Sequence, residues 1–193
     1  MIHTFSVDIA DKLIRSGLPA DKKEVYVYGL ECSLNLIISD SILLTYAFYM
    51  GQIPELLLWL ICFSLLRTHV GGYHAPSHFL CILGGIFTGI LCLRGHSILY
   101  DYPNLTAFLL IICAIFIWKC APITSPFRAM SKNKQRKEHH LSVFIFTSET
   151  ICSLLLYYFS PAYTTVIISS ILASSIFAII GYFHYHKDND SQT

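Results

Sequence analysis

The stretch AYTTVIISSILASSIFAIIGYF, residues 162–183, decides the fold because it contains no Asp, Glu, Lys or Arg. A helix rises about 1.5 Å per residue and the hydrocarbon core of a bilayer is about 30 Å thick, so about 20 apolar residues cross it. Residues 107–118 and 141–159 are almost as poor in charge. The short alternating segments of a β-barrel do not occur. The sequence therefore predicts an all-α, polytopic integral membrane protein.

The composition of the 193 residues agrees with this prediction. Hydrophobic residues make up 54% and charged residues 13%, about half the charged share of a soluble domain. The seven cysteines include no C-x-x-C pair, which argues against a disulfide framework and a zinc site. We expect no metal, no cofactor and no nucleic-acid partner. Residues 1–23 lack a continuous apolar core, so a cleaved signal peptide is not expected.

About six transmembrane helices are expected, separated by glycine, proline and polar residues. They cover approximately residues 25–50, 53–66, 79–93, 105–121, 141–159 and 162–183. Residues 2–18 carry apolar side chains at helical spacing with charges between them, which predicts an amphipathic helix lying on the membrane. The alternative for this segment is a frayed polar tail. We expect residues 1–193 to form a single membrane domain.

The distribution of basic residues predicts the orientation. With the N-terminus in the cytoplasm, six spans place 12 of the 13 Lys and Arg residues on the cytoplasmic side, and only Arg94 outside. The positive-inside rule favours this orientation over its reverse. The sequence thus predicts a multi-pass protein of the cell membrane with both termini in the cytoplasm.

The connection between the second and third spans concentrates reactive side chains. It reads RTHVGGYHAPSHFLC, residues 67–81. We expect Gly71 and Gly72 to form a tight turn, and a helix to start near Ala75. His74 would stand just before this helix and Cys81 within it, and seven residues of helical spacing, about two turns, would bring both to one face. The segment is predicted to lie at the cytoplasmic face.

A thiol beside an imidazole is a candidate nucleophile with a base. We predict that His74 and Cys81 are catalytic, and that Arg67 binds a substrate carboxylate or stabilises negative charge in the transition state. Amides of the Gly71–Gly72 turn, or of the start of the following helix, are candidates for an oxyanion site. Glu31, in the first span, is a candidate for orienting His74.

Simpler interpretations exist for the same residues. A cysteine in an apolar span is usually a small packed side chain. His74 and His78 are four residues apart, but no Glu lies between them as the metalloprotease signature requires. Tyr73 and His78 lie near His74 in this segment and are expected to line the site.

The segment resembles the signature of the accessory gene regulator B (AgrB) family, membrane endopeptidases of Gram-positive quorum sensing. The resemblance rests on Arg67, the glycine pair, His74 and Cys81, and on the six spans, the N-terminal amphipathic segment and the basic loop before the last two spans. It implies a cysteine endopeptidase that cleaves an AgrD-like precursor peptide. An acyl-enzyme thioester on Cys81 would then pass to a side chain of the peptide and give a thiolactone or lactone autoinducing peptide. A homodimer is expected from the resemblance alone.

The basic cytoplasmic loop 122–140 is the predicted contact for the precursor. Its cations attract an acidic peptide tail and also anionic lipid headgroups, or they serve only to fix the topology. The residues are Lys132, Lys134, Arg136 and Lys137. Two other classes stay open at this point, a small multi-span transporter and a non-catalytic membrane partner protein.

Overall fold

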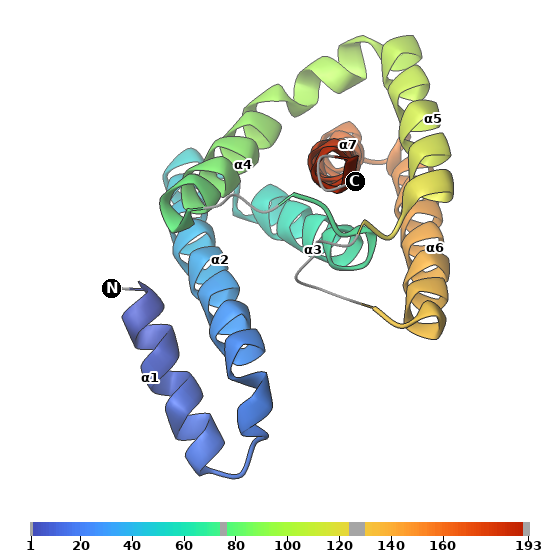
Figure 1. Ribbon diagram of the computed structural model, residues 1–193. Helices are drawn as coiled ribbons and strands as arrows, with labels where there is room; N and C mark the ends of the chain where they lie inside the picture. The colour runs from blue at the N-terminus through green and yellow to red at the C-terminus, as the bar shows by residue number, and fades with distance from the viewer. Residues whose placement is uncertain (1, 74–76, 124–129, 191–193) are drawn as a thin grey trace. The chain divides into compact units, whose positions relative to one another are not determined.

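The computed structural model describes residues 2–73, 77–123 and 130–190, which form helices joined by short connections (Figure 1). The elements are α1 (Ile2–Arg15), a short 3-10 helix η1 (Ala20–Lys22), α2 (Lys23–Met50), α3 (Ile53–Val70), α4 (His78–Asp101), α5 (Pro103–Cys120), α6 (Lys132–Leu156) and α7 (Pro161–Asp190). The six helices α2 to α7 are long and apolar enough to cross a membrane. The prediction of six spans and an N-terminal helix is confirmed.

The amphipathic helix α1 ends at Arg15, three residues before the predicted end. Gly17 has φ 112°, a left-handed conformation that glycine adopts without steric cost. The Gly17 amide donates to the Ile14 carbonyl at 3.0 Å, and the Leu18 amide donates to the Leu13 carbonyl at 3.3 Å. This pair of bonds is the Schellman motif, which closes the helix and turns the chain toward α2.

The second and third spans are longer than predicted. Helix α3 continues past residue 66 to Val70, and α4 continues past residue 93 to Asp101. Both predicted ends stand directly before an arginine, Arg67 or Arg94. A charged side chain near a membrane surface does not end a helix when its head finds a partner there. Arg67 donates to backbone carbonyls, and Arg94 lies 3.4 Å from the Met50 sulfur.

The chain divides into two compact units, one formed by residues 1–46 and 75–87 and the other by residues 47–74 and 88–193. Within the second unit, α7 contacts α3, α5 and α6, and Figure 1 shows it end-on among these helices. In the most apolar 18-residue stretch of α7, 61% is buried. In the corresponding stretch of each other span, 28% or less is buried. Helix α7 is therefore the central helix of this unit.

The core of the second unit is built from all four of these helices. Helix α3 contributes Cys62, Leu66 and Val70, which are four residues apart and so form one stripe along the helix. The other buried members are Cys113, Ile117, Ala121, Ile123, Phe146, Ile167, Ile171 and Ala178.

Helix α7 carries buried hydroxyl groups between these apolar side chains. The Ser169 hydroxyl donates to the Val166 carbonyl at 2.8 Å, and the Ser170 hydroxyl donates to the Ile167 carbonyl at 2.7 Å. Each hydroxyl is thus satisfied by its own helix. Small side chains let neighbouring helices approach closely in a membrane, where burial of apolar surface gives no driving force.

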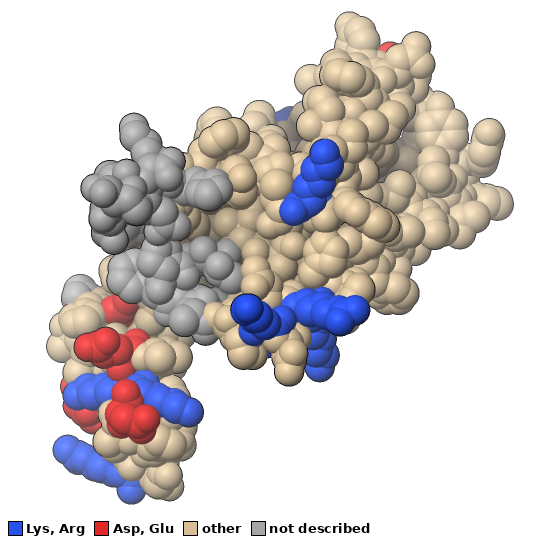
Figure 2. All heavy atoms as spheres, turned by 45° about the vertical axis from the view of Figure 1, so that its right-hand side comes forward, with Lys and Arg blue, Asp and Glu red and all other residues tan. Residues whose placement is uncertain are grey.

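The outer surfaces of the spans are apolar. Large side chains such as Phe48, Phe87, Phe108, Trp118 and Leu155 are exposed. On the face drawn in Figure 2, Lys, Arg, Asp and Glu cover only a small part of the described surface. A surface of this kind suits contact with lipid rather than water.

Replacing Gly181 by Ala should destabilise the second unit. An added Cβ at this position on α7 would lie 2.5 Å from the Tyr73 amide nitrogen and 2.7 Å from the Gly72 carbonyl carbon. Overpacking of this kind costs about 1–3 kcal/mol, so the purified protein should melt at a lower temperature. Gly95→Ala is the matched control, because a Cβ there meets no atom within 4 Å. Equal melting temperatures for the two variants would contradict this packing.

Candidate active site

Arg67 closes the end of α3. Its guanidinium donates a hydrogen bond to the carbonyl oxygen of Gly71. It donates a second one, 2.5 Å long, to the carbonyl oxygen of Tyr73. The guanidinium carbon lies 5.4 Å from the centre of the Phe177 ring on α7, within the range of a cation–π contact. Arg67 thus binds the backbone of the segment that leads to His74. Its predicted contact with substrate stays a prediction.

The glycine pair forms the expected turn. Gly71 has φ 76°, and a Cβ on it would collide with the Ile123 backbone. The Ile123 amide donates to the Val70 carbonyl at 2.8 Å, and the Tyr73 amide donates to the Phe177 carbonyl at 2.9 Å. The turn is therefore fixed from two sides.

One part of the oxyanion prediction is wrong. The Gly71 amide donates to the Arg67 carbonyl at 3.1 Å, as the closing hydrogen bond of α3. An amide used in this way does not point at a substrate oxygen. The turn therefore shapes the chain, and Gly71 contributes its conformation rather than its N–H group.

Helix α4 begins at His78, three residues later than predicted. The Ser77 hydroxyl accepts a hydrogen bond from the Leu80 amide at 3.3 Å, as a serine before the first helical residue typically does. His74 lies outside the described residues. The expected position of His74 beside Cys81 therefore stays a prediction. Cys81 lies in the first turns of α4 and is half-buried.

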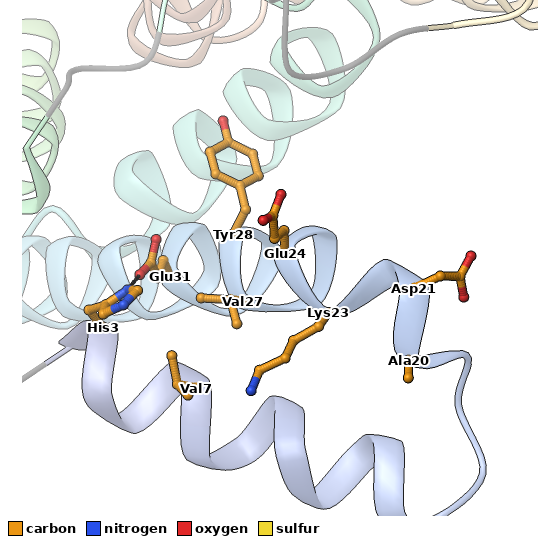
Figure 3. A pocket seen from close by; sticks show the side chains of 9 residues that line it. All are labelled: His3, Val7, Ala20, Asp21, Lys23, Glu24, Val27, Tyr28 and Glu31. Carbon is orange, nitrogen blue, oxygen red and sulfur yellow. Dashed lines mark hydrogen bonds and ion pairs between the residues drawn. The ribbon is translucent and has the colours of Figure 1, made fainter.

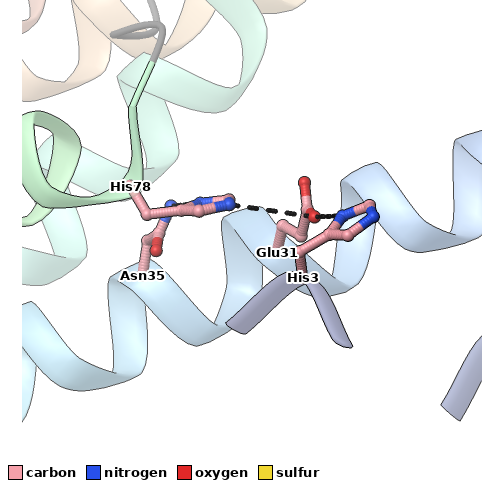
Figure 4. A network of polar contacts seen from close by, with 4 residues as sticks. All are labelled: His3, Glu31, Asn35 and His78. Atoms are coloured by element: carbon pink, nitrogen blue, oxygen red, sulfur yellow. Dashed lines mark hydrogen bonds and ion pairs between the residues drawn. The ribbon is translucent and has the colours of Figure 1, made fainter. Parts of the chain in front are cut away.

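A polar cluster surrounds the start of α4 within the first unit (Figure 4). The Glu31 carboxylate, on α2, lies 2.6 Å from the His3 Nδ1 atom and 3.8 Å from the His78 Nε2 atom. The other ring nitrogen of His78 lies 3.2 Å from the Asn35 side-chain nitrogen. The predicted role of Glu31 toward His74 stays a prediction. Among the described residues, Glu31 contacts two other histidines.

Helices α2 and α4 remain in contact beyond this cluster. The Ser39 hydroxyl donates to the Asn35 carbonyl at 2.9 Å and lies 3.4 Å from the Ile82 carbonyl on α4. A Cβ on Gly85 would lie 3.3 Å from the same hydroxyl. Small and hydroxylated residues thus let the two helices approach closely, which fixes the position of the first turns of α4 against α2.

A hollow of about 590 Å³ lies between α1 and α2 (Figure 3). His3 and Glu31 are among its lining residues, and Lys23 reaches from α2 toward α1 (Figure 3), where it pairs with Asp11 at 2.6 Å. The lining residues are His3, Val7, Ala20, Asp21, Lys23, Glu24, Val27, Tyr28 and Glu31. The hollow combines an apolar floor with charged groups of both signs.

The predicted basic loop 122–140 is wrong for its second half. Helix α6 begins at Lys132, and the Ser131 hydroxyl accepts a hydrogen bond from the Lys134 amide at 3.4 Å. Lys132, Lys134, Arg136 and Lys137 are therefore helical. The hydropathy pattern did not indicate that α6 begins at Lys132, because the first turns of α6 are polar and exposed. The apolar residues that predicted the span begin later in the helix. Residues 124–129 of the predicted loop lie outside the described residues.

The basic turns of α6 border a shallow hollow of about 580 Å³. Arg136 and Lys137 line it beside Leu141 and Phe144. Cations above an apolar floor are suited to anions that also carry apolar groups.

Two further polar contacts in the second unit have no counterpart in the sequence pattern. His69 on α3 lies 2.6 Å from the Glu138 carboxylate on α6. The His139 Nδ1 atom lies 2.8 Å from the Ala121 carbonyl oxygen. The first contact attaches the start of α6 to the end of α3, and the second attaches it to the residue that follows α5. Their members are far apart in the chain, so no local pattern reveals them.

Arg67→Lys should destabilise the turn although the charge is retained. A lysine ammonium lacks the planar fork that reaches two carbonyls at once, and each lost hydrogen bond from a charged group costs about 1.5–3 kcal/mol. We expect a lower melting temperature and faster proteolysis between α3 and α4. Lys119→Arg, at the end of α5, is the control. A melting temperature of the Arg67→Lys protein equal to wild type would show that the turn does not depend on the guanidinium.

Comparison with known proteins identifies the family of the chain. The sequence pattern of the accessory gene regulator B family matches residues 6–180. The chain is 28% identical over 171 residues to AgrB-like protein 2 of Clostridium perfringens strain 13, covering 82% of this chain and 79% of that protein. An AgrB-like protein of strain SM101 matches to the same extent. No solved structure matches. The chain belongs to the accessory gene regulator B family and is a multi-pass membrane protein, a membership that supports a role in agr quorum sensing.

Proposed function

We propose that this protein is a membrane cysteine endopeptidase that cleaves an AgrD-like precursor peptide and supports its cyclisation. The observation that carries the proposal is the family match over residues 6–180, which includes the whole segment 67–81. His74 and Cys81 are the proposed catalytic residues. Arg67, Gly71 and Gly72 support them by holding the chain that leads to His74.

The proposed reaction conserves the energy of the acyl bond. His74 takes the proton of the Cys81 thiol, and the sulfur attacks the scissile carbonyl carbon to form a C–S bond. The C–N bond then breaks as His74 gives that proton to the leaving amine. A thiol or hydroxyl of the bound peptide then gives its proton to His74 and attacks the thioester. The new ring closes as the thiolate of Cys81 is released. The exchange needs no nucleotide.

We place the site at the cytoplasmic face of the cell membrane, with both termini in the cytoplasm. The distribution of Lys and Arg supports this orientation, because Arg94 is the single basic residue of the 13 that is expected outside the cell. The basic turns of α6 then face the same side as the segment 67–81. The contact between His69 and Glu138 supports this arrangement, because it attaches these turns to the end of α3.

The basic turns of α6 are the proposed binding site for the acidic tail of the precursor. Lys132, Lys134, Arg136 and Lys137 lie within the first two turns of one helix, so their charges act together on a nearby anion. The apolar floor formed by Leu141 and Phe144 suits a peptide that approaches along the membrane surface.

Cys81→Ala should abolish cleavage, because alanine cannot form the thioester. The assay co-expresses the protein with an AgrD-like precursor peptide and measures the released tail by mass spectrometry. His74→Gln should also lose cleavage, by at least about a hundredfold. Cys152→Ala is the control, since this exposed cysteine lies in a different helix. Normal processing by Cys81→Ala would refute the peptidase assignment.

Reversing charge on α6 should weaken processing without affecting the fold. We expect Lys134→Glu combined with Arg136→Glu to lower the cleavage rate at least about tenfold at low salt, with a smaller loss at high salt because salt screens the attraction. A precursor whose tail carries Gln in place of its acids should respond little to the substitutions. Arg94→Glu, expected on the opposite side, is the control. Equal losses with both precursors would exclude tail binding by α6.

A further inference from the structure

Helix α6 presents different groups on the two sides of its first turns. Arg136 and Lys137 are exposed and line the shallow hollow described above. Glu138 and His139 follow them directly, but these two residues are half-buried and do not line that hollow. With about 3.6 residues per turn, the second pair stands on the side of the helix opposite to the first pair. Helix α6 therefore directs two cations outward and two further polar groups toward the protein.

Glu138 attaches this part of α6 directly to the last turn of α3. One carboxylate oxygen of Glu138 lies 2.6 Å from the His69 Nδ1 atom, and the two side chains are 15% and 24% exposed. An ionised carboxylate only accepts, so the ring donates to it whether the histidine is neutral or charged. His69 is the residue before Val70, where α3 ends. The contact therefore joins α6 to a position two residues before Gly71.

His139 attaches α6 to the same turn through a strap, residues 121–123, which follows α5. The His139 Nδ1 atom lies 2.8 Å from the Ala121 carbonyl oxygen. At the other end of the strap, Ile123 forms an isolated β-bridge with Gly71. All three residues of the strap are buried. The strap therefore transmits the position of α6 to the turn.

The turn reached in this way is also fixed to α3 and α7. The Arg67 guanidinium donates to the Tyr73 carbonyl, and the Tyr73 amide donates to the Phe177 carbonyl at 2.9 Å. All of these contacts lie within the second unit. The chain that leads to His74 is thereby held at one distance from the first turns of α6.

The cations of α6 stand close to this attachment. Lys137 is the residue before Glu138, and Lys134 lies about one turn earlier, about 6 Å along the helix axis. Helix α6 is continuous from Lys132 to Leu156, so these cations and the turn form parts of one rigid arrangement. An acidic chain bound to the cations is therefore held at a set distance from the segment 67–74.

We propose that Glu138 and His139 are positioning residues that fix this distance, and that the distance selects precursors by the number of residues between the scissile bond and the acidic tail. A tail that is too close to the scissile bond does not reach the cations while that bond lies in the site. A longer connection still reaches them, and its cost rises only slowly with length. The inference rests on the proposed function for the cleavage and for the tail as the ligand of α6.

The test compares precursors of different spacing, using the full chain in lipid nanodiscs. An AgrD-like precursor peptide is shortened by about four residues between the scissile bond and its acids, which removes up to about 13 Å of reach, or lengthened by the same number of Gly and Ser residues. We expect the shortened precursor to lose about tenfold in kcat/KM, mainly through a higher KM, because its tail no longer reaches the cations. The lengthened precursor should lose less than about threefold. Equal kcat/KM for all three precursors would overturn the proposal.

The variant that releases the start of α6 combines Glu138→Leu with His139→Leu. The released turns can follow a shorter tail, so the ratio of kcat/KM between the original and the shortened precursor should fall from about ten to below about three. A loss of stability alone would slow both precursors equally and leave the ratio unchanged, which would overturn the proposal. Gln135→Leu, at an exposed position of the preceding turn, is the matched control and should retain the ratio. Glu138→Gln keeps an acceptor for His69 and should also retain it.

Hydrogen–deuterium exchange measures the attachment without any precursor. The Ile123 amide is protected by its bond to the Val70 carbonyl, which depends on the position of the strap. We expect the fragment that contains residues 121–123 to exchange about tenfold faster in the double variant than in wild type. If the double variant does not fold, His139→Leu alone provides the measurement, because it removes only the bond to Ala121. Unchanged exchange would overturn the proposal.

The two measurements separate the inference from the proposed function. If the variant exchanges faster but wild type cleaves no precursor, the proposed function fails, while the positioning of the turn by Glu138 and His139 stands. Cleavage that depends on Cys81 but proceeds equally at every spacing overturns the inference and leaves the proposed function in place.

Discussion

Hydrocarbon offers no hydrogen-bond partner, so every polar group within the six spans must be satisfied by the protein itself. This constraint governs the internal structure of the molecule. Serines of α7 donate to carbonyls of their own helix. The central helix can therefore carry buried polar side chains that are also small. Asn35 and His78 contact each other between α2 and α4. Polar residues in these helices therefore bond either within their own helix or to a neighbouring element, and large apolar side chains dominate the exposed positions.

The same constraint explains the position of Arg67. A guanidinium at the end of a span must find acceptors, and the carbonyls after the last turn of α3 are the nearest groups that are not already paired. Arg67 donates to the carbonyls of Gly71 and Tyr73. These bonds satisfy the guanidinium and also fix the direction of the chain after α3. The Tyr73 amide adds a bond to Phe177 on α7. The segment that leads to His74 is thus positioned by the central helix of the second unit.

The helical architecture followed from the sequence because long charge-free stretches permit few alternatives in a membrane. Pro54, Pro103 and Pro161 were expected to separate the spans, and each stands at the first or second position of a helix. Helix ends near charged residues were harder to predict. Whether a helix includes Arg67 or Lys132 depends on the contacts of these side chains, which a hydropathy pattern does not contain. The pair of Glu31 and Asn35 was recognisable from its four-residue spacing. Its partner was not, because His78 approaches from a helix more than 40 residues away in the chain.

The helical state of the basic segment has a consequence for recognition. A flexible loop with the same four cations would lose conformational freedom each time it held an anion, and that loss would weaken binding. In α6 the backbone is already ordered from Lys132 onward, and successive charges stand at fixed angles around the axis. An incoming chain of carboxylates or phosphates therefore meets a pattern of set spacing. It can be discriminated by the separation of its negative groups as well as by their number.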